Sequence, residues 1–283
     1  MAGWLKPRCL MRTPTSPGRL GRADLHLHTL ASDGLLSADA LLDYAEHYTN
    51  LDVIAITDHD EVRAAMRARE RAEQLGYRVR VIPGVEVSTR HGHLIGLFVE
   101  DRPCAFRSYQ ETAEWIVARG GLCIAPHPMT RVTHSVSRPV LEDCARRGLI
   151  AGVEVWNPSP AGRASRNKAL AFAAEHPVAA IGASDAHWRR IVGMASTRFD
   201  GSSAEDLRRA ILEGTTVAEG RFASALELAL EALPQTVWAT VVLPLRRLRR
   251  FSGDLRGPRP RTLMAPPASL LVPQPTTNTT RLA

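Results

Sequence analysis

The sequence predicts an α/β fold built as a barrel. Short apolar runs alternate with amphipathic stretches from Ala23 to about Arg221, a pattern typical of parallel strands joined by helices. Seven such apolar runs favour a barrel over an open sheet. The length of 283 residues and the 45% hydrophobic composition suit one large domain, because single α/β barrels contain about 200–250 residues.

Strands and helices are predicted in alternation along most of the chain. Ser37 begins the first helix, because a serine directly before an amphipathic run is a favourable N-cap. The predicted strands cover residues 23–27, 53–57, 79–82, 93–98, 122–126, 152–156 and 178–182. The predicted helices cover residues 37–48, 61–75, 109–119, 139–147, 163–175 and 203–213.

Composition divides the chain into four regions. The N-terminal segment holds prolines and glycines without an apolar period, and the C-terminal tail is rich in Pro, Thr and Arg, so both are predicted to be disordered. The regions are residues 1–21 (basic N-terminal segment), 22–222 (barrel), 223–250 (terminal amphipathic helix) and 251–283 (tail).

The region over residues 223–250 has two interpretations. It carries no charge from Ala232 to Leu245, and the basic run RRLRR follows. Interrupted by Pro234 and Pro244, this stretch is too short for a comfortable membrane span. A terminal helix packed on the barrel is favoured, and an interfacial anchor on anionic lipid is the alternative.

The formal net charge of +7 is concentrated in the two tails. Residues 1–22 and residues 223–283 each carry +5, so the remainder carries −3. A basic tail is usually solvated, and weak contact with anionic lipid or nucleic acid is the alternative. No obligate protein partner is indicated.

The cysteines and the N-terminal residues indicate in which cellular compartment the protein is expected. None of the four cysteines forms a CxxC pair, and no apolar signal segment is present at the N-terminus. Reduced thiols in a cytoplasmic protein are therefore expected, with attachment to a membrane surface through residues 223–250 as the alternative.

Ligand-type side chains gather where the predicted strands end. His26 and His28 form an HxH pair, and residues i and i+2 of a strand point to the same side. Asp33 follows in the next loop. The later segments TDHD, PGVEVST, HGHLIG, LCIAPHP and SDAH supply Asp58, His59, Asp60, Glu86, His91, His93, His127, Asp185 and His187.

This placement predicts a metal cluster. The carboxyl ends of barrel strands form the rim on which active sites are built, so these side chains converge although they are far apart in sequence. A carboxylate such as Glu86 can bridge two ions about 3.5–4 Å apart. Each motif alone has a structural alternative: TDHD can cap a helix, and His127 can be a buried core histidine. The agreement of all segments favours the cluster.

Taken in order, DLHLHT, SDG, TDHD, GVEVST, HGHLIG, HP and SDAH resemble the motifs of the PHP (polymerase and histidinol phosphatase) family over about residues 23–220. The resemblance implies a distorted, TIM-like (β/α)7 barrel with a trinuclear metal site at the rim. It also implies the metal ligands His26, His28, Asp33, His59, Glu86, His93, His127, Asp185 and His187.

The resemblance is closest to the nucleotide phosphatase and 5′–3′ exonuclease branch, because Asp33 stands where histidinol phosphatases tend to have His. That branch usually carries an insertion after the fourth motif, and only 33 residues separate His93 from His127 here. The implied activity is hydrolysis of a phosphate mono- or diester by a metal-activated hydroxide. The substrate would be a nucleotide, an oligonucleotide or a small phosphometabolite.

The cofactors and further site residues follow from the same chemistry. Imidazole and carboxylate without thiolate suit two or three Mn, Fe or Zn ions. Asp58 and Asp60 flank His59 and are expected to orient it. Arg131 and His134 are candidates for gripping phosphate, and so are Arg163 and Asn167, each against a plain surface or capping role.

Two other functions compete with this interpretation. An amidohydrolase-type barrel also begins with HxH, but its binuclear members use a carbamylated lysine at a strand end. The only lysines are Lys6 in the N-terminal segment and Lys168 in a predicted helix. The other alternative, a non-catalytic barrel, predicts gaps in the ligand set, and the set has none.

Overall fold

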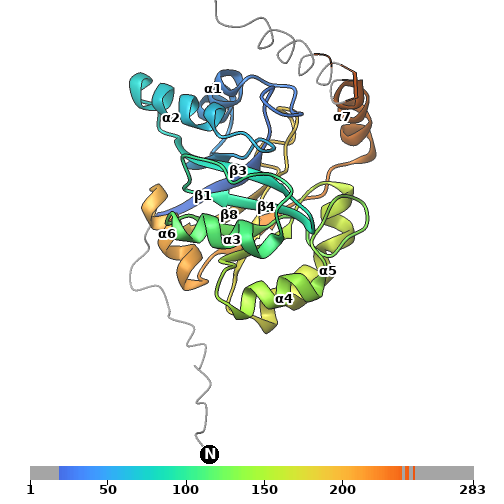
Figure 1. Ribbon diagram of the computed structural model, residues 1–283. Coiled ribbons are helices and arrows are strands. Elements are labelled where there is room, and N and C mark those ends of the chain that lie inside the picture. The colour runs from blue at the N-terminus through green and yellow to red at the C-terminus, as the bar shows by residue number, and fades with distance from the viewer. Residues whose placement is uncertain (1–18, 238–239, 242–244, 246–283) are drawn as a thin grey trace, which may run out of the picture. The chain divides into compact units, whose positions relative to one another are not determined.

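A computed structural model describes residues 19–237, 240–241 and 245 (Figure 1). Nearly the whole of this range belongs to one compact unit that ends at Leu243, and a second unit begins at Pro244. The predictions of disorder for residues 1–18 and 251–283 lie outside the described residues, as does most of the segment from 238 to 250.

Nine strands and seven helices follow one another in the described residues. The strands are β1 (Leu20–Leu27), β2 (Val53–Ile56), β3 (Arg80–Thr89), β4 (Gly92–Leu97), β5 (Leu122–Ala125), β6 (Gly152–Trp156), β7 (Ala179–Gly182), β8 (Ala195–Asp200) and β9 (Val217–Gly220). The helices are α1 (Ala38–Tyr48), α2 (Arg63–Leu75), α3 (Tyr109–Ala118), α4 (Arg138–Arg146), α5 (Pro160–Glu175), α6 (Ala204–Glu213) and α7 (Ala225–Val237).

The strands form one sheet that curls into a nearly closed barrel. Their order is β7-β6-β5-β4-β3-β2-β1-β8-β9, so β1 to β7 are neighbours in sequence order. β1, β2 and β3 pair in parallel, as do β5, β6 and β7, while β4 runs antiparallel between the two groups. This confirms the predicted α/β barrel and departs from a uniformly parallel one.

The segment that follows β7 closes the barrel on its rim side. Ala186 pairs with Leu27 as a parallel bridge, and its carbonyl accepts a hydrogen bond from the His28 N–H at 3.0 Å. The Ala186 N–H in turn donates to the carbonyl of His26 at 3.3 Å. The end of the seventh strand therefore lies directly beside the end of the first.

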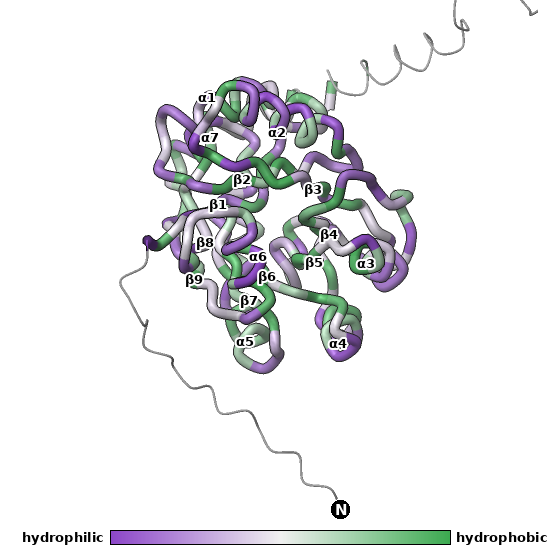
Figure 2. The backbone as a smooth tube through the Cα atoms, turned by 90° about the vertical axis from the view of Figure 1, so that its left-hand side faces the viewer, coloured by the Kyte–Doolittle hydropathy of each residue, from purple (hydrophilic) through white to green (hydrophobic). Residues whose placement is uncertain are grey.

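β8 and β9 close the other end of the barrel. β8 pairs antiparallel with both β1 and β9, and the three lie side by side in Figure 2. The Thr197 hydroxyl accepts from the Gly182 N–H at 3.0 Å and donates to its carbonyl at 2.8 Å, which links β8 to β7. Thr216 adds a bond to the carbonyl of Ala180 at 2.8 Å.

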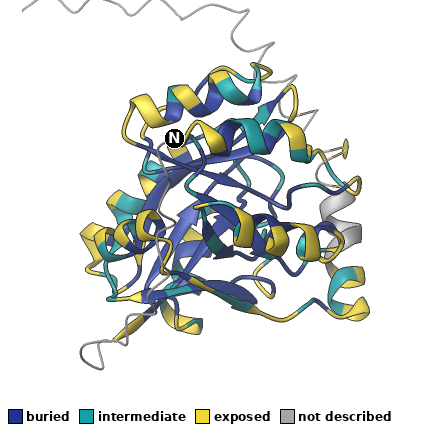
Figure 3. Ribbon diagram, turned by 90° about the horizontal axis from the view of Figure 1, so that it is seen from below, coloured by how far each residue is buried: buried dark blue, intermediate teal, exposed yellow. Residues whose placement is uncertain are grey.

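Helices cover the outside of the barrel with their apolar faces turned inward. Figure 3 shows buried strands surrounded by helices whose outer surfaces are exposed. α1 and α2 pack through residues such as Leu42 and Ala68, α3 to α5 through residues such as Ile116 and Phe172, and α6 through Leu207. Burial of this apolar area is the main favourable term for the fold.

The predicted elements are confirmed, with boundaries that differ by at most three residues except in the third strand. That strand continues through Pro83 and Gly84 to Thr89, so Glu86 lies inside it and not after it. β8 and β9 were not predicted. β1 begins at Leu20, inside the N-terminal segment predicted to lack structure.

α7 occupies part of the region predicted as a terminal amphipathic helix. Leu228 packs against an apolar cluster of the barrel, whereas Leu226 and Leu230 are exposed. The first turn of the helix therefore contacts the barrel through Leu228. Across residues 19–237, 240–241 and 245, no helix is both long and apolar enough to cross a bilayer.

Candidate metal centre

β1 and the closing segment place four site residues next to one another. His26 and His28 project to the same side of β1 and are almost fully buried. Asp185 and His187 flank Ala186, which pairs with this strand, so they face the two histidines. The ring of His187 stacks on the ring of His28 at 4.3 Å.

The end of β2 and the middle of β3 bring two further residues to the same place. His59 forms a parallel bridge with Glu86, and the Asp60 N–H donates to the Glu86 carbonyl at 2.9 Å. Glu86 is buried, although it is a carboxylate. A buried carboxylate requires charged or hydrogen-bonding partners.

His93 and His127 come from β4 and from the end of β5. β4 is antiparallel to its neighbours, so its first residues lie at the rim where the parallel strands end. His93 therefore reaches the site from the start of its strand. His127 follows β5 directly and is almost fully buried.

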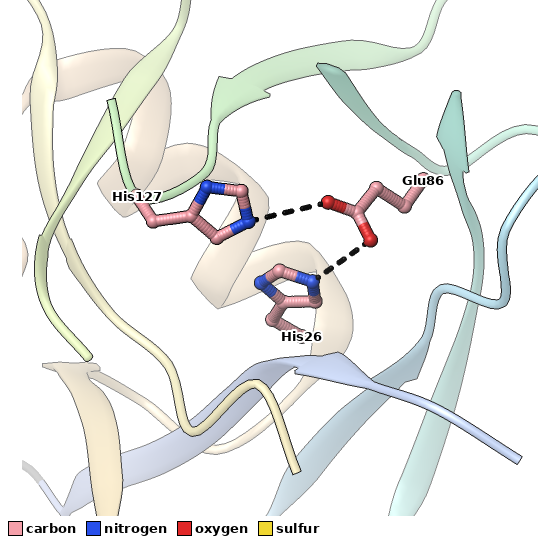
Figure 4. Close-up of side chains that lie close together, drawn as sticks. All are labelled: His26, Glu86 and His127. Carbon is pink, nitrogen blue, oxygen red and sulfur yellow. Dashed lines mark ion pairs between the residues drawn. The ribbon is translucent and has the colours of Figure 1, made fainter. Parts of the chain in front are cut away.

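Five imidazoles surround the Glu86 carboxylate, and Figure 4 shows two of them, His26 and His127. Its Oε2 lies 3.2 Å from Nε2 of His26, 3.2 Å from Nε2 of His28 and 3.3 Å from Nδ1 of His59. Its Oε1 lies 3.0 Å from Nδ1 of His93 and 3.5 Å from Nε2 of His127. The two oxygens therefore face different groups of histidines.

Two other carboxylates complete the cluster. Asp185 Oδ1 lies 3.3 Å from His26 Nε2 and 3.4 Å from His28 Nε2. Asp33 Oδ2 lies 3.1 Å from His187 Nε2 and 3.7 Å from His59 Nε2. All nine residues predicted as ligands are thus brought together.

Hydrogen bonds to Nδ1 turn Nε2 of His26 and His187 toward the cluster. His26 Nδ1 lies 2.9 Å from Glu154 Oε1, and His187 Nδ1 lies 2.9 Å from the carbonyl of Asp185. Both partners accept hydrogen bonds, so each Nδ1 carries the proton. Once the second proton is lost, Nε2 offers its lone pair, which is the form that binds a metal.

Serine hydroxyls hold two further imidazoles. His28 Nδ1 lies 3.4 Å from the Ser32 hydroxyl, which donates to Asp58 at 2.5 Å. His127 Nδ1 lies 3.3 Å from the Ser135 hydroxyl, which donates to the carbonyl of His127 at 2.7 Å. Each serine has its own proton engaged and can accept one from the imidazole.

The residues present fit divalent cations. Within the described part of the chain, this cluster holds most of the buried polar atoms that have no hydrogen bond of acceptable geometry. Burying a polar atom without a partner costs free energy of folding. These site atoms are His26 Nε2, His28 Nε2, Asp33 Oδ1, His59 Nδ1, Glu86 Oε1 and His93 Nδ1. Imidazole nitrogens and carboxylate oxygens at this spacing are the ligands of Mn, Fe and Zn.

The electrostatics of the cluster also favour cations. Burial raises the pKa of Glu86, but the charges of His59 and His93 outweigh burial and hold this pKa well below its ordinary value. Burial lowers the pKa of His28, but the neighbouring carboxylates, Asp33 first, raise it to about 10. The carboxylates thus hold a second proton on His28, and a divalent ion would take the place of that proton.

Asp58 and Asp60 lie beside the site, and their side chains bond to other residues than the imidazole that they were predicted to orient. Asp58 accepts hydrogen bonds from the Thr29 N–H at 2.7 Å, the Thr29 hydroxyl at 2.6 Å and the Ser32 hydroxyl. Asp60 accepts from the Ser88 N–H at 3.0 Å. Asp58 therefore fixes the loop that follows β1, and Asp60 ties the end of β2 to β3.

The candidates for gripping phosphate are exposed, and His134 is the one that contacts a clustered residue. His134 packs edge-on against His93 at 5.2 Å, and burial lowers its pKa. Arg131 is exposed on the same loop. Arg163 and Asn167 are exposed on α5, and the Arg163 guanidinium lies 4.3 Å from the ring centroid of Phe222.

Two buried site residues were not predicted. Glu154 of β6 accepts from the His127 N–H and from Asn157 Nδ2, both at 2.8 Å, in addition to its contact with His26. Asn157 also donates to Asp185 at 3.3 Å. The available signal was a single acidic residue inside the otherwise apolar strand GVEVW.

The backbone is strained at this site. Asp60, His127 and Asp185 have φ angles of 52°, 26° and 52°, in the left-handed region that side chains other than glycine rarely adopt. Such conformations cost about 1–3 kcal/mol each and persist where surrounding contacts enforce them. His127 and Asp185 are two of the clustered residues, whereas Asp60 ties the end of β2 to β3.

Comparison with known proteins agrees with this geometry. The sequence model of a family described as PHP-associated matches residues 163–216. An uncharacterised protein of Methanocaldococcus jannaschii is 33% identical over 148 residues, which cover 48% of this chain and 81% of that protein. The chain belongs to the PHP family. PHP proteins are metal-dependent phosphoesterases, and the His, Asp and Glu side chains of the cluster are of types that bind divalent metals.

Two further PHP relatives show how far the likeness extends. A 5′–3′ exoribonuclease of Salmonella typhimurium is 39% identical over 104 residues, and this match spans only 35% of each protein. A two-domain protein of Bacteroides vulgatus, described as containing a predicted PHP-like metal-dependent phosphoesterase, has the same fold. Its TM-score is 0.61 at 22% identity, over 72% of this chain and 66% of that one.

Proposed function

We propose that this PHP protein hydrolyses phosphate mono- or diesters at a site of two or three divalent ions, Mn, Fe or Zn. The proposed ligands are the nine clustered residues His26, His28, Asp33, His59, Glu86, His93, His127, Asp185 and His187. The substrate class is a nucleotide, a short oligonucleotide or a small phosphorylated metabolite. The exoribonuclease relative supports a nucleic-acid substrate, over the third of its length that this chain matches.

The position of Glu86 carries the proposal. Glu86 belongs to two separate groups of potential ligands, one with His26 and His127 and the other with His59 and His93. In each group one histidine lies nearest Oε2 and the other nearest Oε1. A carboxylate in this position is suited to bridging two ions. A site for one ion would not need a second set of nitrogens on the far side of the same carboxylate.

The chain's own residues would prepare the site for phosphate chemistry. Divalent ions bound there would supply a nucleophile at neutral pH and neutralise the phosphoryl oxygens. Glu154 and Ser135 hold the imidazoles in the tautomer that leaves Nε2 free. His134 and Arg131, at the edge of the site, are proposed to contact the phosphate as it enters.

The rival amidohydrolase function fits the site less well. It calls for a lysine at a strand end, but Lys168 lies on α5, is exposed and donates to the carbonyl of Met129 at 3.0 Å. Lys6 lies outside the described residues. A barrel without metals would not be expected to keep nine ligand-type side chains together.

The test combines metal analysis with hydrolysis. The full chain, loaded with Mn, is assayed on p-nitrophenyl phosphate and bis(p-nitrophenyl) phosphate, then on phosphorylated metabolites and short RNA and DNA oligomers. Two or more ions per chain and hydrolysis lost in Glu86→Gln are expected. The matched control Glu142→Gln, on the surface of α4, should retain both. Fewer than one ion per chain, or cleavage only of amide substrates, would refute the proposal.

A further inference from the structure

A cavity opens beside the metal centre. Its volume is about 290 Å³, and Asp185 and His187 form part of its wall. The rest of the wall comes from the loop after β5, from the start of α5, and from Ile191, Ala223 and Leu228. Because two proposed ligands line it, a phosphate held at the metals would project its ester group toward this cavity.

The wall is apolar apart from the two site residues and a few hydroxyls. Pro158, Pro160, Ala161, Ile191 and Leu228 contribute hydrocarbon surface. No arginine or lysine is among the lining residues, so a second phosphate placed here would be desolvated without a cationic partner. Ligand pockets run from about 300 Å³ upward, and this one, at the lower limit, suits a single ring.

The start of α7 forms the outer wall and is held firmly in place. The Ala223 N–H donates to the carbonyl of Pro158 at 3.3 Å, across the cavity wall. Arg221 pairs with Glu227 at 2.6 Å, and Glu227 also accepts from the Ser224 N–H at 2.8 Å. The segment that begins the terminal helix is thus built into the site.

We infer that this cavity binds the leaving group of the ester, and that it selects substrates whose leaving group is a single uncharged ring over those that carry a second phosphate. The inference rests on the proposed phosphoesterase function. It assigns Ala161, on α5, and Leu228, on α7, as specificity-determining residues on opposite elements.

Binding of uncleaved analogues tests the cavity separately from the chemistry. Calorimetry of the Mn-loaded full chain compares benzylphosphonate with methylphosphonate, which differ only by the ring. Benzylphosphonate should bind at least about tenfold more tightly, from the apolar area that the ring buries. Equal binding of the two would overturn the inference.

Two variants assign the effect to the wall. Ala161→Leu fills the cavity and should remove most of the preference for benzylphosphonate while binding of methylphosphonate stays unchanged. Ala164→Leu, the same change at an exposed position of the same helix, should leave both unchanged. Leu228→Ala removes hydrocarbon from the other side and should reduce the preference several-fold, which keeps the test decisive if Ala161→Leu does not fold. A loss of affinity for both ligands alike would place the effect at the metals and overturn the inference.

Hydrolysis separates this inference from the proposed function. The full chain is assayed on 2-phenylethyl phosphate, on ethyl phosphate and on a nucleoside 3′,5′-bisphosphate. The expected order of kcat/KM places 2-phenylethyl phosphate first. Hydrolysis of all three at equal rates overturns the leaving-group pocket alone, whereas hydrolysis of none overturns the phosphoesterase function and the pocket together.

Discussion

Glu154→Gln should weaken metal binding although Glu154 is not itself a proposed ligand. The carboxylate accepts from three donors: His26 Nδ1 at 2.9 Å, and the His127 N–H and Asn157 Nδ2 at 2.8 Å each. A glutamine of the same shape keeps one oxygen and places an NH2 group where the other was. In either orientation the NH2 group of the glutamine must then face at least one hydrogen-bond donor.

The cheaper orientation keeps the oxygen toward His127 and Asn157, because it preserves two bonds and reverses one. The NH2 group then donates to His26 Nδ1, so the imidazole proton moves to Nε2, the atom that faces Glu86 and Asp185. Metal binding must restore the first tautomer and lose a charge-assisted bond of about 1.5–3 kcal/mol. Because about 1.4 kcal/mol corresponds to a tenfold change in the dissociation constant, the affinity for the metal should fall about 10–100-fold.

The assay is competition for Mn with a chromogenic chelator at constant pH, with far-UV circular dichroism to check the fold. Glu142→Gln is the matched control, because Glu142 is a half-buried surface residue that pairs with Arg138 on α4. A Glu154→Gln protein that binds Mn within twofold of the unaltered chain would refute the tautomer argument. A protein that melts earlier but keeps its affinity would make Glu154 a packing residue.

Four other outcomes are expected. Asp185→Ala should lower turnover by more than about 100-fold with unchanged circular dichroism, and near-normal turnover would remove it from the ligand set. EDTA should abolish hydrolysis and Mn should restore it. Hydrolysis that continues after prolonged chelation would show that the reaction does not depend on a metal. Because carboxylates raise the pKa of His28 to about 10, Mn must displace protons, so calorimetry should show proton release and an affinity that rises from pH 6 to pH 9. Thr197→Val leaves the N–H and the carbonyl of Gly182 without their hydroxyl partner, and the free energy of unfolding in urea should fall by about 1–3 kcal/mol. An unchanged free energy of unfolding would argue against a contribution of this link between β7 and β8.

The parts of the fold that could be predicted are those whose pattern is local. Buried parallel strands such as VIAI and LCIA appear in the sequence as apolar runs, and their ends carry the ligand motifs. Pro83 and Gly84 resemble a strand end, which is why the third strand was predicted too short. β8 includes Ser196, Thr197 and Arg198, and β9 (VAEG) includes Glu219 and Gly220, so neither forms an apolar run.

The site was predictable to the extent that motifs mark individual ligands. The antiparallel direction of β4 was not predictable from the sequence. The two-residue connection between β3 and β4 lacks the Asn-Gly or Asp-Gly pair that marks a hairpin strongly. The partners of Asp58 were not predictable either, because its three hydrogen bonds reach back 26 or 29 residues to the loop after β1. Contacts of this kind depend on tertiary packing and leave no trace in the spacing of residues along the sequence.

The junction between the first strand and the segment after the seventh has a consequence for how the molecule opens. Asp33 and His187 are 154 residues apart in the chain and 3.1 Å apart in space, and proposed ligands lie on both sides of that junction. An ion shared between them would bind the folded chain and not the unfolded one, so its removal takes away that stabilisation and frees the two sides of the junction to separate. The metal-free protein should then exchange its amide hydrogens first along residues 183–187, which makes metal supply a determinant of proteolytic lifetime as well as of turnover.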